Sequence, residues 1–195
     1  MENKFDQGEL KIVLASASPR RKEILTNAGF KFEIITSDVD ESLPSGTEAT
    51  DAVSMLSARK AEAVRKICGD EVLIIGSDTL LEHEGEPLGK PKDESDAKRI
   101  LMSLSGKRHF VHTGVALCYK GKSIVSYDST AVYMKPYTEK EATDYIKTGE
   151  CMDKAGAYAI QGIGAALVEK TDGEFDTVVG FPSKLFLKML AEITK

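Results

Sequence analysis

The stretch Leu14-Ala15-Ser16-Ala17-Ser18-Pro19-Arg20-Arg21-Lys22 contains the end of a predicted strand, a short serine loop and the start of a helix. The proline begins the helix where a missing N–H is tolerated best, and the serine before it is a good N-cap. The three basic residues that follow are unfavourable in a first turn, where the helix dipole is already positive. A strand-end loop with free N–H groups, hydroxyls and arginines is suited to bind an anion. The alternative is an ordinary surface helix with solvated arginines.

Composition narrows the class of protein. The 195 residues are 42% hydrophobic and carry a net charge of −5, enough apolar material for one domain over residues 1–195 or two joined lobes. This charge provides no basic surface for nucleic acid or an anionic membrane, so a polyanionic ligand would need a local cationic pocket.

The cysteines and the N-terminus predict a cytoplasmic protein. Cys68, Cys118 and Cys151 form no CxxC pair, so neither a disulfide framework nor a thiolate metal site is expected. Residues 1–10 are polar, and no later apolar run approaches membrane-spanning length.

Strands and helices alternate along the chain, which predicts an α/β fold: a mixed twisted sheet with flanking helices, bilobed with a central cleft. Strands are expected at residues 12–15, 30–34, 72–75, 111–119 and 123–134, and around Leu167 and Val178. Helices are expected at residues 19–28, 47–68, after Asp93, from Thr138 to Gly149 and from Pro182, with a Gly/Pro loop at 84–91.

Familiar phosphate and metal motifs do not fit. Residues 85–91 are one residue short of a P-loop, and Leu167 replaces the third small residue of a dinucleotide fingerprint. His109 and His112 are three residues apart on a predicted strand and therefore lie on opposite faces, which does not favour a histidine metal site.

Two charged residues stand in apolar surroundings. Lys60 lies near the middle of a helical apolar stripe formed by Val53, Leu56, Val64 and Ile67. Such a lysine must extend to solvent, pair with a carboxylate or meet a charged ligand. Asp78 follows the apolar strand 72–75 at its carboxyl end, where open α/β sheets bind ligands, although it is also suited to cap a turn.

Spaced motifs through the chain resemble the Maf family of nucleoside triphosphate pyrophosphatases, which is related in fold to inosine triphosphatases. The resemblance extends from Ile12 to Leu190 and rests on residues 15–21, 76–79, 89–91, 105–114, 153–158 and 179–182. It implies cleavage between the α- and β-phosphorus of a nucleoside triphosphate, assisted by Mg²⁺ or Mn²⁺. Small departures, with Ser77 where Ala is common and Phe181 where Leu is common, change no charge.

The resemblance also implies roles for individual residues. Asp78 matches the general base, or else a metal ligand, and Glu41 matches an acidic position near the metal. The remaining matches are with groups that contact the triphosphate: Ser16, Ser18, Arg20, Arg21, Lys60 and Lys90. Guanidinium groups suit bidentate phosphate contact, and lysines act as point charges.

Base preference is implied by Arg20, Thr79 and Gln161, which match positions linked to specificity and resemble the branch acting on dTTP and UTP. The 7-methyl-GTP branch has an acidic residue in place of Gln161. An amide suits the mixed donor and acceptor edge of thymine or uracil, whereas a carboxylate suits the donor edge of guanine. Without the resemblance, Gln161 is a polar loop residue.

Two alternative functions remain open: a Maf pyrophosphatase with a different base preference, and a non-catalytic nucleotide-binding regulator of cell division. The family resemblance alone also implies a homodimer.

Overall fold

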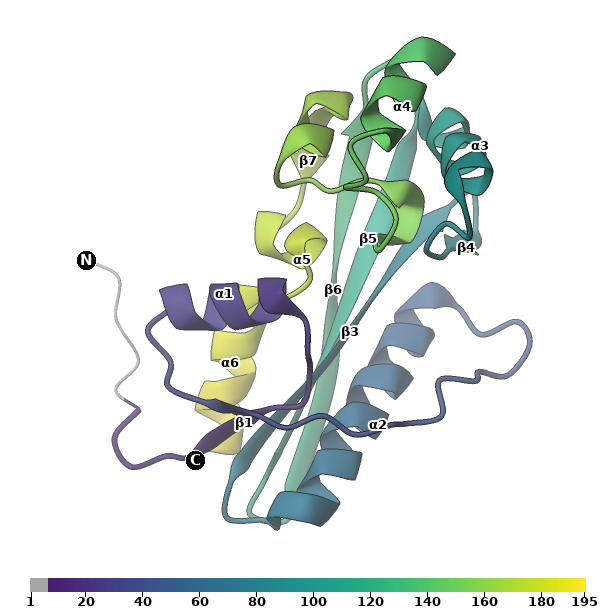
Figure 1. The fold of residues 1–195 in the computed structure, drawn as a ribbon. Helices are drawn as coiled ribbons and strands as arrows, with labels where there is room; N and C mark the ends of the chain where they lie inside the picture. The colour runs from purple at the N-terminus through teal and green to yellow at the C-terminus, as the bar shows by residue number, and fades with distance from the viewer. Residues whose placement is uncertain (1–6) are drawn as a thin grey trace. The chain divides into compact units, whose positions relative to one another are not determined.

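The structure is a computed structural model that describes residues 7–195, so residues 1–6 of the polar N-terminal stretch lie outside the described residues. A seven-stranded sheet in the order β2-β1-β3-β5-β6-β7, with β4 paired to β3, is flanked by helices (Figure 1). The predicted mixed α/β fold is therefore confirmed.

Along the chain the elements are β1 (Ile12–Leu14), α1 (Pro19–Asn27), β2 (Glu33–Ile34), α2 (Ala49–Cys68), β3 (Leu73–His83), β4 (Glu86–Leu88), α3 (Glu94–Leu104), β5 (Arg108–Tyr119), β6 (Lys122–Met134), α4 (Glu139–Ile146), the short 3-10 helices η1 (Ala155–Ala157) and η2 (Ile163–Leu167), β7 (Val168–Asp172), α5 (Phe175–Val179) and α6 (Ser183–Ile193). Within residues 7–195, none of these helices is both long enough and apolar enough to span a bilayer.

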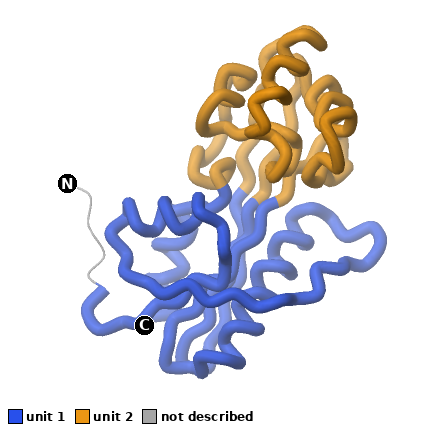
Figure 2. Tube along the Cα trace, in the orientation of Figure 1, with its two compact units in different colours: residues 1–79, 113–128, 180–195 blue, residues 80–112, 129–179 orange. Residues whose placement is uncertain are grey.

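The chain divides into two compact units (Figure 2). The first unit contains the described residues up to Thr79 together with residues 113–128 and 180–195, and the second contains residues 80–112 and 129–179. Strands β3, β5 and β6 each contribute residues to both units.

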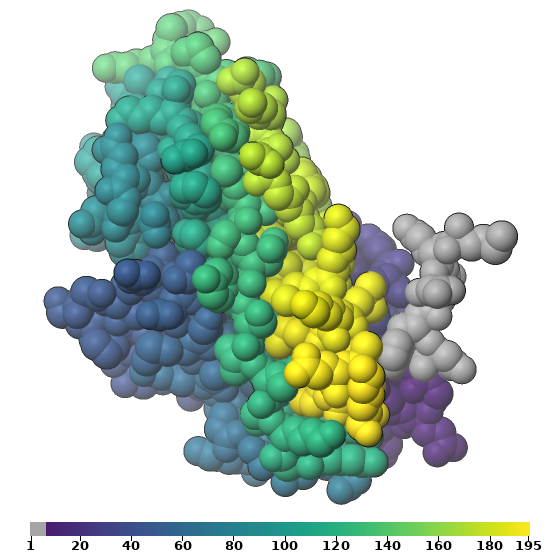
Figure 3. Space-filling view, turned by 180° about the vertical axis from the view of Figure 1, so that it is seen from behind, coloured from purple at the N-terminus to yellow at the C-terminus, as the bar shows by residue number. Residues whose placement is uncertain are grey.

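In the first unit, β1 pairs in parallel with both β2 and β3. Successive side chains of a strand point to opposite faces of a sheet, so Ile12 and Leu14 enter one apolar cluster and Val13 enters another. The first cluster is completed by α1 and α6, and the second by α2. Figure 3 shows the outer surface of α6 in yellow beside the green β6, whose Ile124 packs against the first cluster.

Two predictions for the first unit are wrong. Ile67 is 62% exposed and is not part of the buried stripe of α2, because in the last turn of the helix it is Cys68 that packs against the apolar cluster. The strand expected at residues 30–34 is reduced to the two residues of β2, since the Phe30 N–H donates to the Leu25 carbonyl of α1 and only Glu33 and Ile34 pair with β1.

In the second unit, α3 packs against α4 and η1. Asp93 caps α3 by accepting a hydrogen bond from the Asp96 N–H at 2.8 Å, and Thr138 forms a capping box with Glu141 at the start of α4. Both helix starts were therefore predicted correctly.

Two other predictions for this unit are wrong. The Gly/Pro loop at 84–91 contains β4, which forms a hairpin with β3 through Glu84 and Gly85, both at positive φ. Pro87 does not favour a strand prediction, because proline has no N–H for strand pairing. An edge strand nevertheless tolerates proline. Val178 lies in helix α5 and not in a strand.

Candidate functional site

The site begins where β1 ends. The parallel pairing of β1 with β3 stops at Leu14 opposite Ile75, and the Ala15 N–H donates a last hydrogen bond to the Ile75 carbonyl at 2.8 Å. The chain then leaves the sheet through the serine loop into α1, whereas β3 continues to His83. Asp78 therefore lies within a strand, not at its end or in a turn, and the carboxyl end that opens beside it is that of β1.

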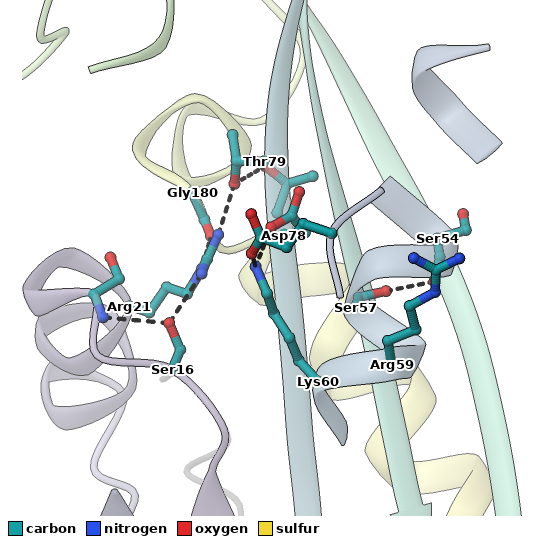
Figure 4. A network of polar contacts seen from close by, with 12 residues as sticks. Ser16, Arg21, Ser54, Ser57, Arg59, Lys60, Asp78, Thr79 and Gly180 are labelled. Atoms are coloured by element: carbon teal, nitrogen blue, oxygen red, sulfur yellow. Dashed lines mark hydrogen bonds and ion pairs between the residues drawn. The ribbon is translucent and has the colours of Figure 1, made fainter. Parts of the chain in front are cut away.

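Lys60 pairs with Asp78 across the interface of α2 and β3, one of the three environments predicted for it. Its Nζ lies 2.5 Å from the Asp78 Oδ1 and 2.8 Å from the Glu41 Oε1. The side chains of Lys60 and Asp78 are 19% and 12% exposed, whereas that of Glu41 is 61% exposed. Figure 4 shows the ammonium and the Asp78 carboxylate pointing toward each other.

Two glycines bring α2 close enough to the sheet for this pairing. A Cβ atom on Gly76 of β3 would lie 2.2 Å from the Ser57 carbonyl of α2, and one on Gly114 of β5 would lie 2.2 Å from the Val53 carbonyl. Because any side chain at either position would push the helix away, these glycines set the distance from Lys60 to Asp78.

Arg21 connects three segments that are far apart in the sequence (Figure 4). Its Nε donates to the Gly180 carbonyl at 2.9 Å, its Nη1 to the Ser16 Oγ at 2.9 Å and its Nη2 to the Thr79 Oγ1 at 3.0 Å. Burial lowers the pKa of Arg21 to about 10, an effect that nearby Asp78 opposes and Arg20 reinforces. The predicted phosphate ligand thus also holds the loop that contains it.

Ser16, Ser18 and Arg20 differ in how firmly their side chains are held. Ser16 is buried, and its Oγ accepts hydrogen bonds from the Ser18 N–H at 3.2 Å and from Arg21, which leaves the hydroxyl hydrogen to donate. Ser18 occupies the predicted N-cap position, but its side chain makes no capping hydrogen bond. Arg20 is half-buried, and its side chain makes no hydrogen bond or ion pair with the described residues.

Thr79 follows Asp78 and is held in place by its hydroxyl. Its Oγ1 accepts from Arg21 and lies 3.0 Å from the Thr113 Oγ1 of β5. Gly180, at φ +119°, leaves room beside this hydroxyl, since an added Cβ would lie 3.4 Å from it. Thr113, Gly114 and Gly180 were part of the motifs that carried the family resemblance but received no predicted role.

Lys90 and Gln161 belong to the second unit, and both are exposed. Lys90 follows Gly89, whose carbonyl accepts a hydrogen bond from the Gly156 N–H at 3.1 Å. Gln161 lies in a loop that the Glu150 carboxylate holds: it accepts hydrogen bonds from the N–H groups of Ile163 at 3.1 Å and Gly164 at 2.8 Å.

A hydroxyl strengthens this loop anchor. The Tyr145 hydroxyl donates to the Glu150 Oε2 at 2.9 Å and accepts from the Ala159 N–H at 3.0 Å. Glu150 and Tyr145, neither of which was predicted as a site residue, therefore hold the backbone on both sides of Gln161.

The histidines take structural positions. The His109 Nε2 lies 2.8 Å from the Tyr158 hydroxyl, and the His112 Nδ1 lies 2.7 Å from the Ser129 Oγ. Burial lowers the pKa of His109 to about 3, so its ring is neutral at physiological pH. In the part of the chain that the structure describes, no group of three His, Cys, Asp or Glu side chains is arranged to hold a metal ion.

The residues of the first unit nevertheless fit a magnesium-type ion. Asp78 and Glu41 direct carboxylate oxygens at the same cationic group, the Lys60 ammonium. Mg²⁺ is bound in proteins by one or two carboxylates together with substrate phosphates and water, not by a complete protein cage.

Known proteins match this chain over most of its length. The family described as Maf-like protein matches residues 11–193. A dTTP/UTP pyrophosphatase of Bacillus cereus (strain ZK / E33L) is 43% identical over 182 residues, which cover 93% of this chain and 95% of the relative. A dTTP/UTP pyrophosphatase of Caldanaerobacter subterraneus subsp. tengcongensis is also 43% identical over 182 residues, 92% of this chain and 87% of the relative.

Among solved structures, the Ham1 protein of Staphylococcus aureus matches with a TM-score of 0.45 and 18% identity over 64% of this chain and 71% of that protein. A HAM1 protein from Coxiella burnetii matches with a TM-score of 0.46 and 16% identity over 64% of this chain and 73% of that protein. The match of residues 11–193 and the two relatives at 43% identity establish that the chain belongs to the Maf family.

Proposed function

We propose that this protein is a nucleoside triphosphate pyrophosphatase that hydrolyses dTTP and UTP to the monophosphate and pyrophosphate. The observation that carries the proposal is the Lys60–Asp78 pair beside the loop of Ser16 and Arg21. Family membership and two relatives named dTTP/UTP pyrophosphatase support it.

Binding of the triphosphate requires a local excess of positive charge, because the protein as a whole is acidic. A triphosphate carries about four negative charges, and guanidinium groups hold phosphate oxygens as bidentate donors. We assign this role to Arg20, whose donors are unused by the described residues, and to the remaining N–H groups of Arg21. The Ser16 hydroxyl and the Ser18 N–H add hydrogen-bond donors for the phosphates, and Lys60 adds a point charge.

Asp78 is the proposed general base for hydrolysis. It accepts a proton from a water molecule as the water oxygen forms a bond to the α-phosphorus. The bond from that phosphorus to the oxygen bridging to the β-phosphate breaks, and pyrophosphate leaves with the bond's electron pair. In the protein without nucleotide, the Lys60 ammonium pairs with an Asp78 oxygen. When Lys60 pairs instead with the bound triphosphate, that oxygen becomes free to accept the proton. General-base assistance of this kind accelerates a reaction about 10²- to 10⁴-fold.

A divalent cation, Mg²⁺ or Mn²⁺, fits this scheme with Glu41 and Asp78 as its proposed protein ligands. When bound, it would neutralise phosphate charge and lower the pKa of a bound water. The reducing cytoplasm is the proposed location, in keeping with three cysteines that are all free.

In the second unit, Lys90 is proposed to contact the triphosphate and Gln161 the pyrimidine base. These two assignments follow the family resemblance. Exposure of both side chains and the firm anchoring of the Gln161 loop by Glu150 support them.

The test is pyrophosphate release from UTP, dTTP, CTP, GTP, ATP and 7-methyl-GTP with Mg²⁺ or Mn²⁺. We expect UTP and dTTP to be the preferred substrates, and Gln161→Glu to reduce that preference. Binding of UTP without release of pyrophosphate would favour the non-catalytic regulator, and preference for 7-methyl-GTP would favour the other branch.

A further inference from the structure

Arg59, the residue before Lys60 on α2, holds the chain on both sides of Glu41. Its Nη1 donates to the Asp40 carbonyl at 2.8 Å and to the Ser42 carbonyl at 2.7 Å. Because these carbonyls belong to the residues immediately before and after Glu41, one guanidinium group holds the main chain on both sides of it. The Glu41 carboxylate then reaches the neighbouring Lys60 at 2.8 Å.

The segment held by Arg59 has little other regular structure. It belongs to the connection between β2 and α2, which contains no helix or strand in residues 35–48. Connections of this length are usually mobile unless side chains attach them to the fold. A local turn adds rigidity, since the Ser42 N–H and hydroxyl donate to the two Asp40 carboxylate oxygens at 2.9 and 2.8 Å.

We propose that Arg59 is a positioning residue that places the Glu41 carboxylate beside Lys60 and Asp78. Consecutive residues of α2 then have separate tasks: Arg59 binds the backbone of the loop, and Lys60 binds its carboxylate. The functional part of this inference rests on the proposed function, because it requires Glu41 to act on the triphosphate or its cation.

The first experiment measures hydrogen–deuterium exchange in the protein without nucleotide. Arg59→Ala removes two hydrogen bonds from the loop, so exchange at the Ser42 amide is expected to become about 5- to 10-fold faster. Arg65→Ala is the matched control, because Arg65 lies on the same helix and its guanidinium binds only Glu62 and Asp70 among the described residues. Unchanged exchange in Arg59→Ala, or an equal change in Arg65→Ala, would overturn the proposal.

The second experiment is a double-mutant comparison of UTP hydrolysis. Arg59→Ala and Glu41→Gln are each expected to reduce kcat/KM about 10- to 100-fold, since small displacements of a catalytic group have effects of this size. If Arg59 acts through Glu41, the double variant is no slower than Glu41→Gln alone. Arg59→Lys, which retains the charge but not the planar fork, is expected to recover only part of the loss.

The two proposals fail in different ways. A wild-type protein that hydrolyses no triphosphate would overturn the proposed function, while the exchange experiment would still decide whether Arg59 holds the loop. Independent, multiplying losses in the double variant would overturn the positioning role even in an active enzyme.

Discussion

The Lys60 ammonium lies 2.5 Å from the Asp78 carboxylate, and the two residues come from a helix and a strand that glycines hold unusually close. Both side chains are mostly buried, so the pair is shielded from the screening that weakens surface ion pairs. Removal of Asp78 would leave Lys60 only its ion pair with the exposed Glu41, and removal of Lys60 would leave Asp78 only the nearby charge of Arg21.

Asp78→Asn is expected to reduce kcat for UTP by about 10²- to 10⁴-fold, because the amide cannot accept the proton from water. Binding of a non-hydrolysable UTP analogue is expected to be retained or tightened, since one negative charge near the phosphates is lost. Calorimetry and pyrophosphate release measure the two effects. Asp70→Asn is the control, because Asp70 is exposed and pairs with Arg65. Parallel loss of binding and turnover would contradict the base role.

Substitutions of the adjacent Arg20 and Arg21 are expected to have different effects, on UTP binding for Arg20 and on folding stability for Arg21. Arg21→Ala removes the side-chain donor to the Gly180 carbonyl and one hydrogen bond from each of the Ser16 and Thr79 hydroxyls, and is expected to lower the free energy of unfolding by roughly 2–4 kcal/mol. Arg20→Ala is expected to change it by less than about 0.5 kcal/mol while weakening UTP binding. Urea denaturation and calorimetry distinguish them, and equal stabilities would show that the Arg21 network contributes little.

Gly114→Ala is expected to destabilise the protein by about 1–3 kcal/mol, because the new Cβ would lie 2.2 Å from the Val53 carbonyl. The same displacement of α2 is expected to reduce turnover by moving Lys60 from Asp78. Gly89→Ala provides the stability control, since a Cβ there has nothing within 4 Å. Thermal denaturation of both variants tests the prediction, which fails if Gly114→Ala is as stable as Gly89→Ala.

His109 is expected to make the fold sensitive to acid. Burial lowers its pKa from 6.5 to about 3, so the unfolded chain takes up a proton between these pH values and the folded chain does not. Folded-state stability therefore falls as pH decreases, by roughly 1.5 kcal/mol from pH 6.5 to pH 5 for this group. His109→Gln is expected to flatten this part of the stability curve. If urea denaturation of this variant shows the same change of stability with pH as the wild-type protein, another group causes the acid sensitivity.

Most of the architecture was predictable from local patterns. Proline and glycine mark both ends of α1, and Gly29 has the positive φ expected after a helix. Between the predicted strands 111–119 and 123–134, the chain turns at Lys120 and Gly121, both at positive φ, as in a short hairpin. These elements depend on residues close in the sequence, which is why the predictions succeeded.

The failures involve tertiary contacts. The extension of β3 beyond Ile75 depends on its neighbour β5 and, at Leu81–His83, on its pairing with β4, which contains Pro87. The sequence does not identify the partner of Lys60, because Asp78 is distant along the chain and only folding brings the two together. Similarly, no local pattern reveals that Arg21 binds Gly180 or that Arg59 brackets Glu41.

The anchor beneath Gln161 has a consequence for how this protein can diverge. The Glu150 carboxylate accepts hydrogen bonds from main-chain N–H groups, which do not depend on the side chain at position 161. We therefore expect the loop backbone to keep its conformation when that side chain changes. Under the proposed contact of Gln161 with the base, exchange of that one residue would change the hydrogen-bonding groups offered to the substrate and leave the anchored backbone in place. We therefore expect related chains to acquire new base preferences through single substitutions at this position, at little cost in stability.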